Sequence, residues 1–322
     1  MKSTQESIFS SKTLTYFLQL AETMNYTQAA QLLGITQPAL TQQIKKLERT
    51  VGAPLFYSIG KKLHLSEAGR TMLKATQDIY EVLNVATDQI QQASDASNGK
   101  IQIALLASVE DLAFNDFIAD YYRHNPEVEV VLRMMTRHEI WEKLENNQVD
   151  LAIMYLPDAT IKNWKPYATK KIIDESLVFL HHDESMATRK RVRLADTIKQ
   201  PWVTYPEDYF LSQTLQEAYK NRMVDAPHSV AQFTTPLQLA QFANRTGVNT
   251  ALPNTFYQAH HNYIHAYAAT FEPSVNFELS FVYRKGKDQI PRIAQFLQAF
   301  DEYFASEDYL SRLAKNRVKL KG

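Results

Sequence analysis

The stretch YTQAAQLLGITQPALTQQIKKLE, residues 26–48, constrains the fold of this 322-residue chain more than any other part of it. It contains two short segments with apolar residues at helical spacing, joined at Leu33-Gly34-Ile35. We expect Thr27 to cap the first helix and Gly34 to end it with a positive φ. Thr36 is expected to cap the second helix, so the pattern predicts two helices joined by a tight turn.

The second helix is predicted to bury one stripe and to leave a polar face outward. The buried stripe is Leu40, Ile44, Leu47 and Val51. The outer face carries Gln37, Thr41, Gln42, Lys45 and Lys46. With a preceding helix predicted over residues 11–24, this describes a helix-turn-helix, whose second helix enters the major groove of DNA. Gln and Thr reach base edges and Lys meets phosphate; a solvated helix in a small bundle is the alternative.

The segment that follows, residues 53–69, predicts a β-hairpin with a basic tip at Gly60-Lys61-Lys62. Beside a recognition helix, such a hairpin is a wing that reaches backbone phosphate. The chain carries no net charge, but residues 1–65 hold seven Lys and Arg residues against three acidic residues. This local basic balance favours a DNA-binding unit. Ser66 is expected to cap the next helix, with Gly69 in its first turn.

This N-terminal region resembles the signature of the LysR-type transcriptional regulators. The matching positions are Phe17, Ala21, Thr27, Ala29-Ala30, Leu33, Gln37-Pro38-Ala39, Ile44, Leu47-Glu48, Gly52, Leu55-Phe56, Leu65 and Ala68-Gly69. In that family the positions that match Thr27, Gln37, Pro38 and Thr41 lie at the DNA. The family usually has Arg at the position of Ser58, so one phosphate contact of the wing is expected to be missing here. The predicted DNA-binding residues are Thr27, Thr36, Gln37, Pro38, Thr41, Gln42, Lys45, Lys46, Lys61 and Lys62.

A long helix is predicted from Ser66 to about Ala93, because this segment has no Pro and its apolar residues recur at alternating spacings of four and three. Packing of the helix against its own domain is one interpretation. The family resemblance implies a homodimer through the helix, with either a dimer or a tetramer as the final assembly. The predicted dimerisation residues are Met72, Ala75, Ile79, Val82 and Ala86. Residues 94–100, SDASNGK, are small and polar and predict a hinge.

The C-terminal two-thirds alternates between strand and helix patterns, which predicts an α/β domain with a mainly parallel sheet. The order resembles the two-lobed effector domain of the family, which is similar to periplasmic binding proteins. The predicted fold is therefore α/β and multidomain. Its parts are a winged helix-turn-helix over 1–65, a linker helix over 66–95, an effector domain over 99–304 and a basic tail over 305–322. The first lobe is expected over about 99–158 and 273–304, and the second over about 168–266.

A small-molecule effector is expected between the two lobes, because ligands of open α/β sheets bind beyond the carboxyl ends of strands and against helix N-termini. The predicted effector-binding residues are Ser108, Val109, Thr136, Arg137, Thr204, Tyr205, Phe233, Thr234 and Thr235. Simple helix capping is the alternative for each Ser and Thr. Glu110 and Asp111, expected in a first helical turn, would discourage an anionic effector, whereas Arg137 would favour a carboxylate. Aromatic walls are expected from Tyr155, Trp164, Tyr205 and Phe233.

Several other classes of function lack support in the sequence. There is no Cys, and the pairs His181-His182 and His260-His261 lack the acidic partners of a metal site. No Gly-rich phosphate loop or Gly-x-Ser-x-Gly elbow occurs, and no catalytic constellation is found, so we predict neither an enzyme nor a cofactor beyond the effector.

The sequence also lacks a secretory h-region and an apolar run of the roughly 20 residues that a membrane helix needs. We therefore expect a cytosolic, soluble regulator. Its expected partners are double-stranded DNA, a small-molecule effector and further copies of itself, with RNA polymerase as an additional partner that the resemblance leaves open. The alternative is a small-molecule binding protein whose N-terminal helices serve assembly.

Overall fold

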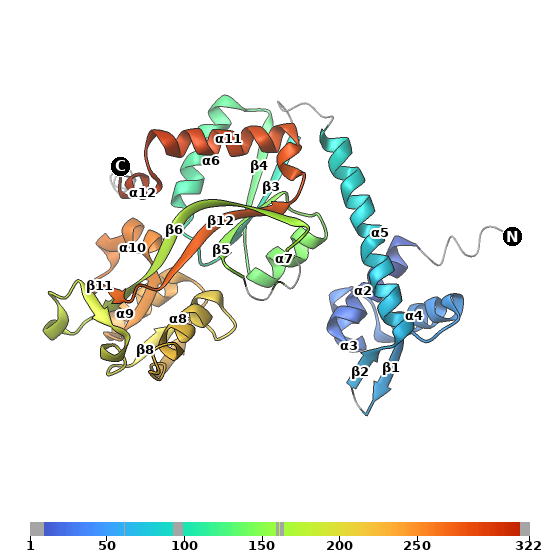
Figure 1. Cartoon of the computed structure of the whole chain (residues 1–322), viewed down its shortest axis with the longest axis horizontal. Coiled ribbons are helices and arrows are strands. Elements are labelled where there is room, and N and C mark those ends of the chain that lie inside the picture. The colour runs from blue at the N-terminus through green and yellow to red at the C-terminus, as the bar shows by residue number, and fades with distance from the viewer. Residues whose placement is uncertain (1–9, 61, 93–98, 159–160, 162–163, 316–322) are drawn as a thin grey trace. The chain divides into compact units, whose positions relative to one another are not determined.

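The computed structural model describes residues 10–60, 62–92, 99–158, 161 and 164–315. The chain divides into two compact units, residues 1–87 and residues 88–322, each with its own buried core (Figure 1). Most of the predicted hinge and the end of the predicted basic tail, residues 94–98 and 316–322, lie outside the described residues.

In the residues that the structure describes, the N-terminal unit contains three short helices, a hairpin and a long helix (Figure 1). They are α2 (Ser11–Thr23), α3 (Tyr26–Leu32), α4 (Gln37–Val51), β1 (Phe56–Ile59), β2 (Lys62–Leu65) and α5 (Glu67–Gln92), the last of which continues beyond this unit. The three short helices pack around a fully buried set of side chains: Phe17, Leu20, Ala29, Leu40 and Ile44. The predicted winged helix-turn-helix is confirmed.

The helix ends follow the capping rules, with one correction. The Oγ1 atom of Thr36 accepts a hydrogen bond from the backbone N–H of Ala39 at 3.4 Å, and Gly34 has a φ of 65°. The predicted cap at Thr27 is wrong. Asn25 precedes α3 instead, and its side-chain oxygen accepts the backbone N–H groups of Thr27 and Gln28. Asn and Thr are both cap residues, and the helix begins two residues earlier than expected.

The recognition helix is tied directly to the wing. The Oε1 atom of Glu48, on α4, accepts the backbone N–H groups of Leu55 and Phe56 at 2.8 Å and 3.2 Å, where β1 begins. Val51, which was predicted to be buried, is exposed because it is the last residue of α4, just before the left-handed Gly52. The start of the wing is therefore held by the hydrogen bonds of Glu48 and by the buried cluster that contains Leu47, and Val51 is not part of that cluster.

The C-terminal unit is built on an eight-stranded sheet. Seven strands follow the order β4-β3-β5-β12-β6-β11-β7, and β10 pairs with β6 beside that path. The strands are β3 (Gly99–Leu106), β4 (Val128–Met135), β5 (Leu151–Leu156), β6 (Tyr167–His181), β7 (Arg191–Arg193), β10 (Thr250–Pro253), β11 (Tyr267–Glu272) and β12 (Asn276–Arg284). A separate pair joins β8 (Trp202–Thr204) to β9 (Ser229–Gln232). The sheet is mixed rather than mainly parallel, since β12 is antiparallel to both β5 and β6.

The long strand β6 belongs to both lobes. Its residues 167–176 pair with β12, whereas residues 177–181 pair with β10 and β11. We call lobe I the part built on β3, β4, β5, β12 and residues 167–176, and lobe II the part built on residues 177–181 and β7 to β11. The chain thus passes between the lobes within a continuous strand near Ser176, later in the chain than the predicted lobe bounds, which place the crossing between about 158 and 168.

Helices cover both lobes. Figure 1 shows α6 (Leu112–His124) and α11 (Pro291–Ser306) together over the lobe I sheet, with α7 (Arg137–Glu145) on its other side. Lobe II carries α8 (Phe210–Lys220), α9 (Pro236–Thr246) and α10 (Asn254–His260). In the described part of the chain, no helix is both long and apolar enough to cross a membrane.

The predicted basic tail is wrong in its first half. Residues 309–315 form the helix α12 (Tyr309–Lys315), in which Tyr309 and Leu313 are buried in the core. Arg312 lies over the Tyr303 ring at 3.6 Å from the centroid and donates to the carbonyl oxygen of that residue. Helix α12 packs against α10 of lobe II and α6 of lobe I, so it joins the two lobes instead of extending into solvent.

Candidate nucleic-acid interface and ligand cavity

The outer face of α4 presents hydrogen-bonding side chains to solvent. Gln37, Gln42, Lys45 and Lys46 are exposed, and Thr41 is half-buried. The side-chain amide of Gln37 donates to Thr41 Oγ1 at 3.0 Å, and that hydroxyl donates to the Gln37 carbonyl oxygen. These bonds orient Gln37 and Thr41 toward each other in the first two turns of α4, and the N-terminal part of a recognition helix meets base edges.

The cationic side chains near this face are available for phosphate. Lys45, Lys46 and Lys62 are exposed and form no ion pair with any residue that the structure describes. The predicted wing residue Lys61 lies outside the described residues. Thr27, Thr36 and Pro38 are exposed around the start of α4 and α3, consistent with a position at the same surface, although Thr27 does not cap a helix.

The wing also exposes apolar groups that the sequence reasoning missed. Tyr57 and Ile59 are 46% and 63% exposed on β1, and the Tyr57 ring stacks on His64 at 5.6 Å. Ser58 lies between them and is exposed on the same strand. Alternation of apolar residues in a four-residue strand is too short a signal to place these side chains in advance.

The apolar stripe of α5 remains largely uncovered within the N-terminal unit. Ile79 is 46% exposed, Val82 is 67% exposed, and Ala75 and Ala86 are also exposed. Met72 was predicted in the dimerisation seam but is half-buried against the core of its own unit. Leu83, 54% exposed, was missed by the heptad pattern. The uncovered stripe therefore starts after the turn that contains Met72.

The predicted effector residues of lobe I are engaged in contacts within the protein. Ser108 and Val109 are buried, and the Ser108 carbonyl oxygen accepts the Tyr155 hydroxyl at 3.1 Å. Thr136 is an exposed N-cap that exchanges hydrogen bonds with Glu139 in a capping box. These contacts match the capping alternative for Thr136.

Arg137 is paired rather than free. Its guanidinium donates to Asp158 at 2.5 Å and to the Tyr155 carbonyl oxygen at 2.8 Å. It also lies over the Phe210 ring at 4.5 Å from the centroid. Burial lowers the pKa of Arg137, and the Asp158 carboxylate opposes that shift. Because Phe210 begins α8, this stack joins lobe I to lobe II.

Glu110 and Asp111 were expected in the first turn of a helix, but they precede α6, which begins at Leu112. Glu110 is buried, accepts the Leu112 backbone N–H at 3.2 Å and lies within hydrogen-bond distance of His260, with 2.7 Å between Oε2 and Nε2. Asp111 takes the N-cap position without a side-chain capping bond. Glu110 is therefore a partner of α10 and does not repel an anion at Ser108 through an open helix end.

The predicted lobe II residues fall into two groups. Thr235 caps α9 in a capping box with Gln238, Thr234 is exposed, and the half-buried Phe233 packs on Phe242 at 5.5 Å. Thr204 and Tyr205, in contrast, line a cavity. The Tyr205 hydroxyl is buried and has no hydrogen-bond partner among the residues described, and burial raises its pKa.

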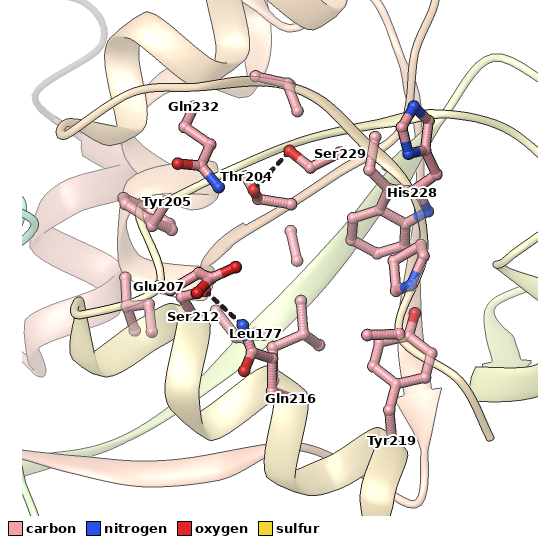
Figure 2. Close-up of a pocket in the computed structure, with 17 residues that line it drawn as sticks. Leu177, Thr204, Tyr205, Glu207, Ser212, Gln216, Tyr219, His228, Ser229 and Gln232 are labelled. Atoms are coloured by element: carbon pink, nitrogen blue, oxygen red, sulfur yellow. Dashed lines mark hydrogen bonds between the residues drawn. The ribbon is translucent and has the colours of Figure 1, made fainter.

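The cavity has a volume of about 350 Å³ and lies within lobe II (Figure 2). Helix α8 forms one wall, β8 and β9 form another, and Leu177 and Ala251 contribute from β6 and β10. No lobe I residue that the structure describes belongs to its lining. The predicted set of nine effector residues is thus not brought together here, since only Thr204 and Tyr205 take part. A site between the lobes for the other seven stays a prediction.

Two family models match the chain. The model of the bacterial regulatory helix-turn-helix protein, lysR family, matches residues 11–70. The model of the LysR substrate binding domain matches residues 94–305, about two-thirds of the chain. The chain belongs to the LysR family of transcriptional regulators. The resemblance of residues 17–69 to that family is confirmed.

Relatives of this LysR-family chain are themselves regulators. It is 27% identical over 208 residues to the HTH-type transcriptional regulator YybE of Bacillus subtilis (strain 168), a match that covers 64% of this chain and 70% of that relative. It is 33% identical over 144 residues to the RuBisCO operon transcriptional regulator of Acidithiobacillus ferrooxidans, a match that covers 45% of this chain and 46% of that relative. The second match thus spans about half the length of its relative.

The LysR-type fold extends over almost the whole chain. The solved structure of a cysteine-to-serine mutant of OxyR from Corynebacterium glutamicum, with bound H2O2, has a TM-score of 0.58 at 16% identity. The likeness covers 96% of this chain and 95% of that chain. At this identity the likeness shows the fold alone.

The aromatic residues that were expected to wall the effector site mostly serve the core of the LysR-type effector domain. Tyr155 is buried, stacks on Phe210 at 5.9 Å and meets Phe277 edge-on at 4.8 Å. Trp164 packs edge-on against Trp141 at 5.4 Å. Tyr155 on β5, Phe277 on β12 and Phe210 on α8 contact one another, so these three rings form a contact between the lobes.

Proposed function

We propose that this LysR-family chain binds specific sequences of double-stranded DNA through α4 and the wing, under the control of a small-molecule effector. The observation that carries the proposal is the outward face of α4, in which hydrogen bonds orient Gln37 and Thr41, while Leu40, Ile44 and Leu47 of the same helix are fully buried. Gln37, Thr41 and Gln42 would read base edges. Lys45, Lys46 and Lys62 would meet phosphate.

We further propose a homodimer through α5, which would place two recognition helices on a two-fold site. The support is the exposed apolar stripe of Ile79, Val82 and Leu83. A Val82→Asp variant is expected to lower the apparent mass in analytical ultracentrifugation, and Lys74→Asp, an exposed change outside the stripe, serves as the control. An unchanged mass in Val82→Asp would contradict dimerisation through this stripe. Assembly to a homotetramer, contact with RNA polymerase and action in the cytoplasm extend the same proposal.

Control by the effector is proposed to be a two-state equilibrium. The effector would favour one arrangement of lobes I and II, and so one spacing of the paired DNA-binding units. It can shift that balance only by the difference between its affinities for the two states. Helix α8 is suited to transmit such a change, because it carries Phe210, which stacks on Arg137 and Tyr155 of lobe I.

Selection from a random double-stranded DNA library tests the proposal. The full chain is expected to enrich one sequence with two-fold symmetry, and Gln37→Ala is expected to enrich it weakly or not at all. A pool that stays random after selection with the wild-type chain would overturn the DNA-reading proposal.

A second candidate is a small-molecule binding protein whose N-terminal unit serves assembly. Three exposed apolar side chains favour it: Leu32, Tyr57 and Ile59, at 64%, 46% and 63% exposure. The same selection separates the candidates, since an assembly unit would not enrich a sequence, and its Leu32→Ser or Ile59→Ser variants would change the oligomeric state instead.

A further inference from the structure

The lobe II cavity is a pocket of ligand size with a divided lining. Its volume of about 350 Å³ falls in the range of roughly 300–1,000 Å³ typical of small-molecule sites. At the packing density of protein interiors, about 0.74, it would hold about 260 Å³ of ligand, the size of a molecule with one or two rings. Its floor is apolar and fully buried, with Trp202, Val203 and Leu177 at no more than 2% exposure.

Two sets of polar side chains also line the cavity. Figure 2 shows Glu207 beside Ser212 and Gln216, and the Gln216 amide donates to the Ser212 hydroxyl at 3.3 Å. On the opposite side, Thr204 and Ser229 share a hydrogen bond of 2.8 Å. These hydroxyl and amide groups donate and accept, so they can orient a ligand that has its own hydroxyl or ammonium group.

The ionisable side chains of the cavity lining favour neutral and cationic ligands over anionic ligands. The residues that line the cavity include no Arg and no Lys. They include one carboxyl side chain, Glu207, and one imidazole, His228, and both are exposed. A ligand carboxylate that lost water here would gain no Lys or Arg partner, and it would meet the carboxyl group of Glu207, so it would bind less favourably. A neutral group would find hydrogen bonds, and an ammonium group would also find the Glu207 carboxylate.

We propose that this cavity binds a neutral or cationic aromatic molecule and rejects aromatic acids. The ring would lie against Trp202 and Leu215, and the hydroxyl or ammonium group would meet Glu207, Ser212 and Gln216. This inference rests on the proposed function, in which the C-terminal unit takes an effector. It also connects the ligand to lobe I, because the wall helix α8 begins at Phe210, which stacks on Arg137.

Three probes with the same ring and different charge test the proposal: phenethylamine, 2-phenylethanol and phenylacetate. Titration calorimetry and the shift in thermal midpoint of the full chain measure their binding. We expect phenethylamine and 2-phenylethanol to bind at least about tenfold more tightly than phenylacetate. Equal or tighter binding of phenylacetate, or no binding of any probe up to its solubility limit, would overturn the proposal.

Charge reversal at the lining locates the binding. Glu207→Lys is expected to reverse the order of the probes, so that phenylacetate binds most tightly. Glu217→Lys is the matched control, since Glu217 is exposed on α8 and does not line the cavity. The control should keep the original order. An order that both variants change, or that neither changes, would place the probes elsewhere and overturn the assignment.

A filled cavity gives an independent check. Ser212→Phe would place a ring in the cavity and is expected to abolish binding of all three probes while the far-ultraviolet circular dichroism stays unchanged. Retained binding in a folded Ser212→Phe protein would refute the site. The DNA selection on the same wild-type preparation separates the two proposals. Probe binding without sequence enrichment would contradict only the DNA-reading proposal. Sequence enrichment without probe binding would contradict only the cavity proposal.

Discussion

Replacement of Gly69 by Ala is expected to destabilise the N-terminal unit, although the same change usually stabilises a helix. Gly69 lies in the first turn of α5, and an added Cβ would be 2.0 Å from the Leu55 carbonyl oxygen and 2.8 Å from Leu65 Cδ2. An ordinary contact is about 3.5 Å, so the backbone that begins the wing would have to move by about 1.5 Å. Overpacking of this kind costs about 1–3 kcal/mol and more where backbone must shift. We take the upper end of this range, about 3 kcal/mol, because the contact is with backbone; the helix propensity of Ala offsets about 1 kcal/mol, which leaves a net loss of about 2 kcal/mol.

Hydrogen exchange measured peptide by peptide in the full chain reports this loss locally. A loss of about 2 kcal/mol corresponds to about 30-fold faster exchange of the protected amides in residues 11–70, with residues 99–306 unchanged. Thr71→Ala is the control, because it also introduces Ala into α5, at a position where the side chain is exposed. It should change the stability by no more than about 0.5 kcal/mol.

The result that would refute the reasoning is equal or slower exchange in Gly69→Ala than in the wild-type chain. That outcome would mean that α5 does not approach the start of the wing as closely as the structure shows, and that the wing is not positioned by this contact.

Three further outcomes are expected. Gln37→Ala should weaken binding to the selected DNA by about 5- to 150-fold while binding to random DNA persists, with Gln31→Ala on α3 as the control; an equal loss on both DNAs would show that Gln37 does not read bases. Lys45→Ala should lower the slope of log K against log salt by about 1, and an unchanged slope would exclude a phosphate contact. Asp158→Ala should destabilise the C-terminal unit by about 3–5 kcal/mol in denaturant unfolding because Arg137 loses its buried partner, and full stability would contradict the pairing.

The local elements were largely predictable because their signals are local. Thr36, Gly34 and Ser66 cap or end helices as expected, since capping depends on a few neighbouring residues. Asn25 caps α3 in place of Thr27, and since Asn and Thr both favour the N-cap position, residue type alone does not choose between them. In the tail, Tyr309 and Leu313 are four residues apart, and this spacing was a usable signal for α12 that the basic composition obscured.

The effector site was much less predictable because it depends on tertiary packing. The sequence places Arg137 after a strand, but only the fold brings Asp158 and Phe210 to it. Residues 167–176, YATKKIIDES, show no regular alternation of apolar and polar residues, and only the fold reveals their pairing with residues 276–284 of β12. The cavity forms where α8 packs over β8 and β9, so Ser212 and Gln216 carry no signal of it in the sequence.

Sequence-specific DNA binding can be measured on the DNA just upstream of the coding sequence of this protein. Purified full-length chain would be titrated across a salt series, with footprinting of the bound DNA. We expect a protected two-fold site and a steep fall in affinity with salt, because several Lys residues would displace counterions from the DNA. Binding that is no stronger there than to random DNA, with no protected site, would contradict this expectation.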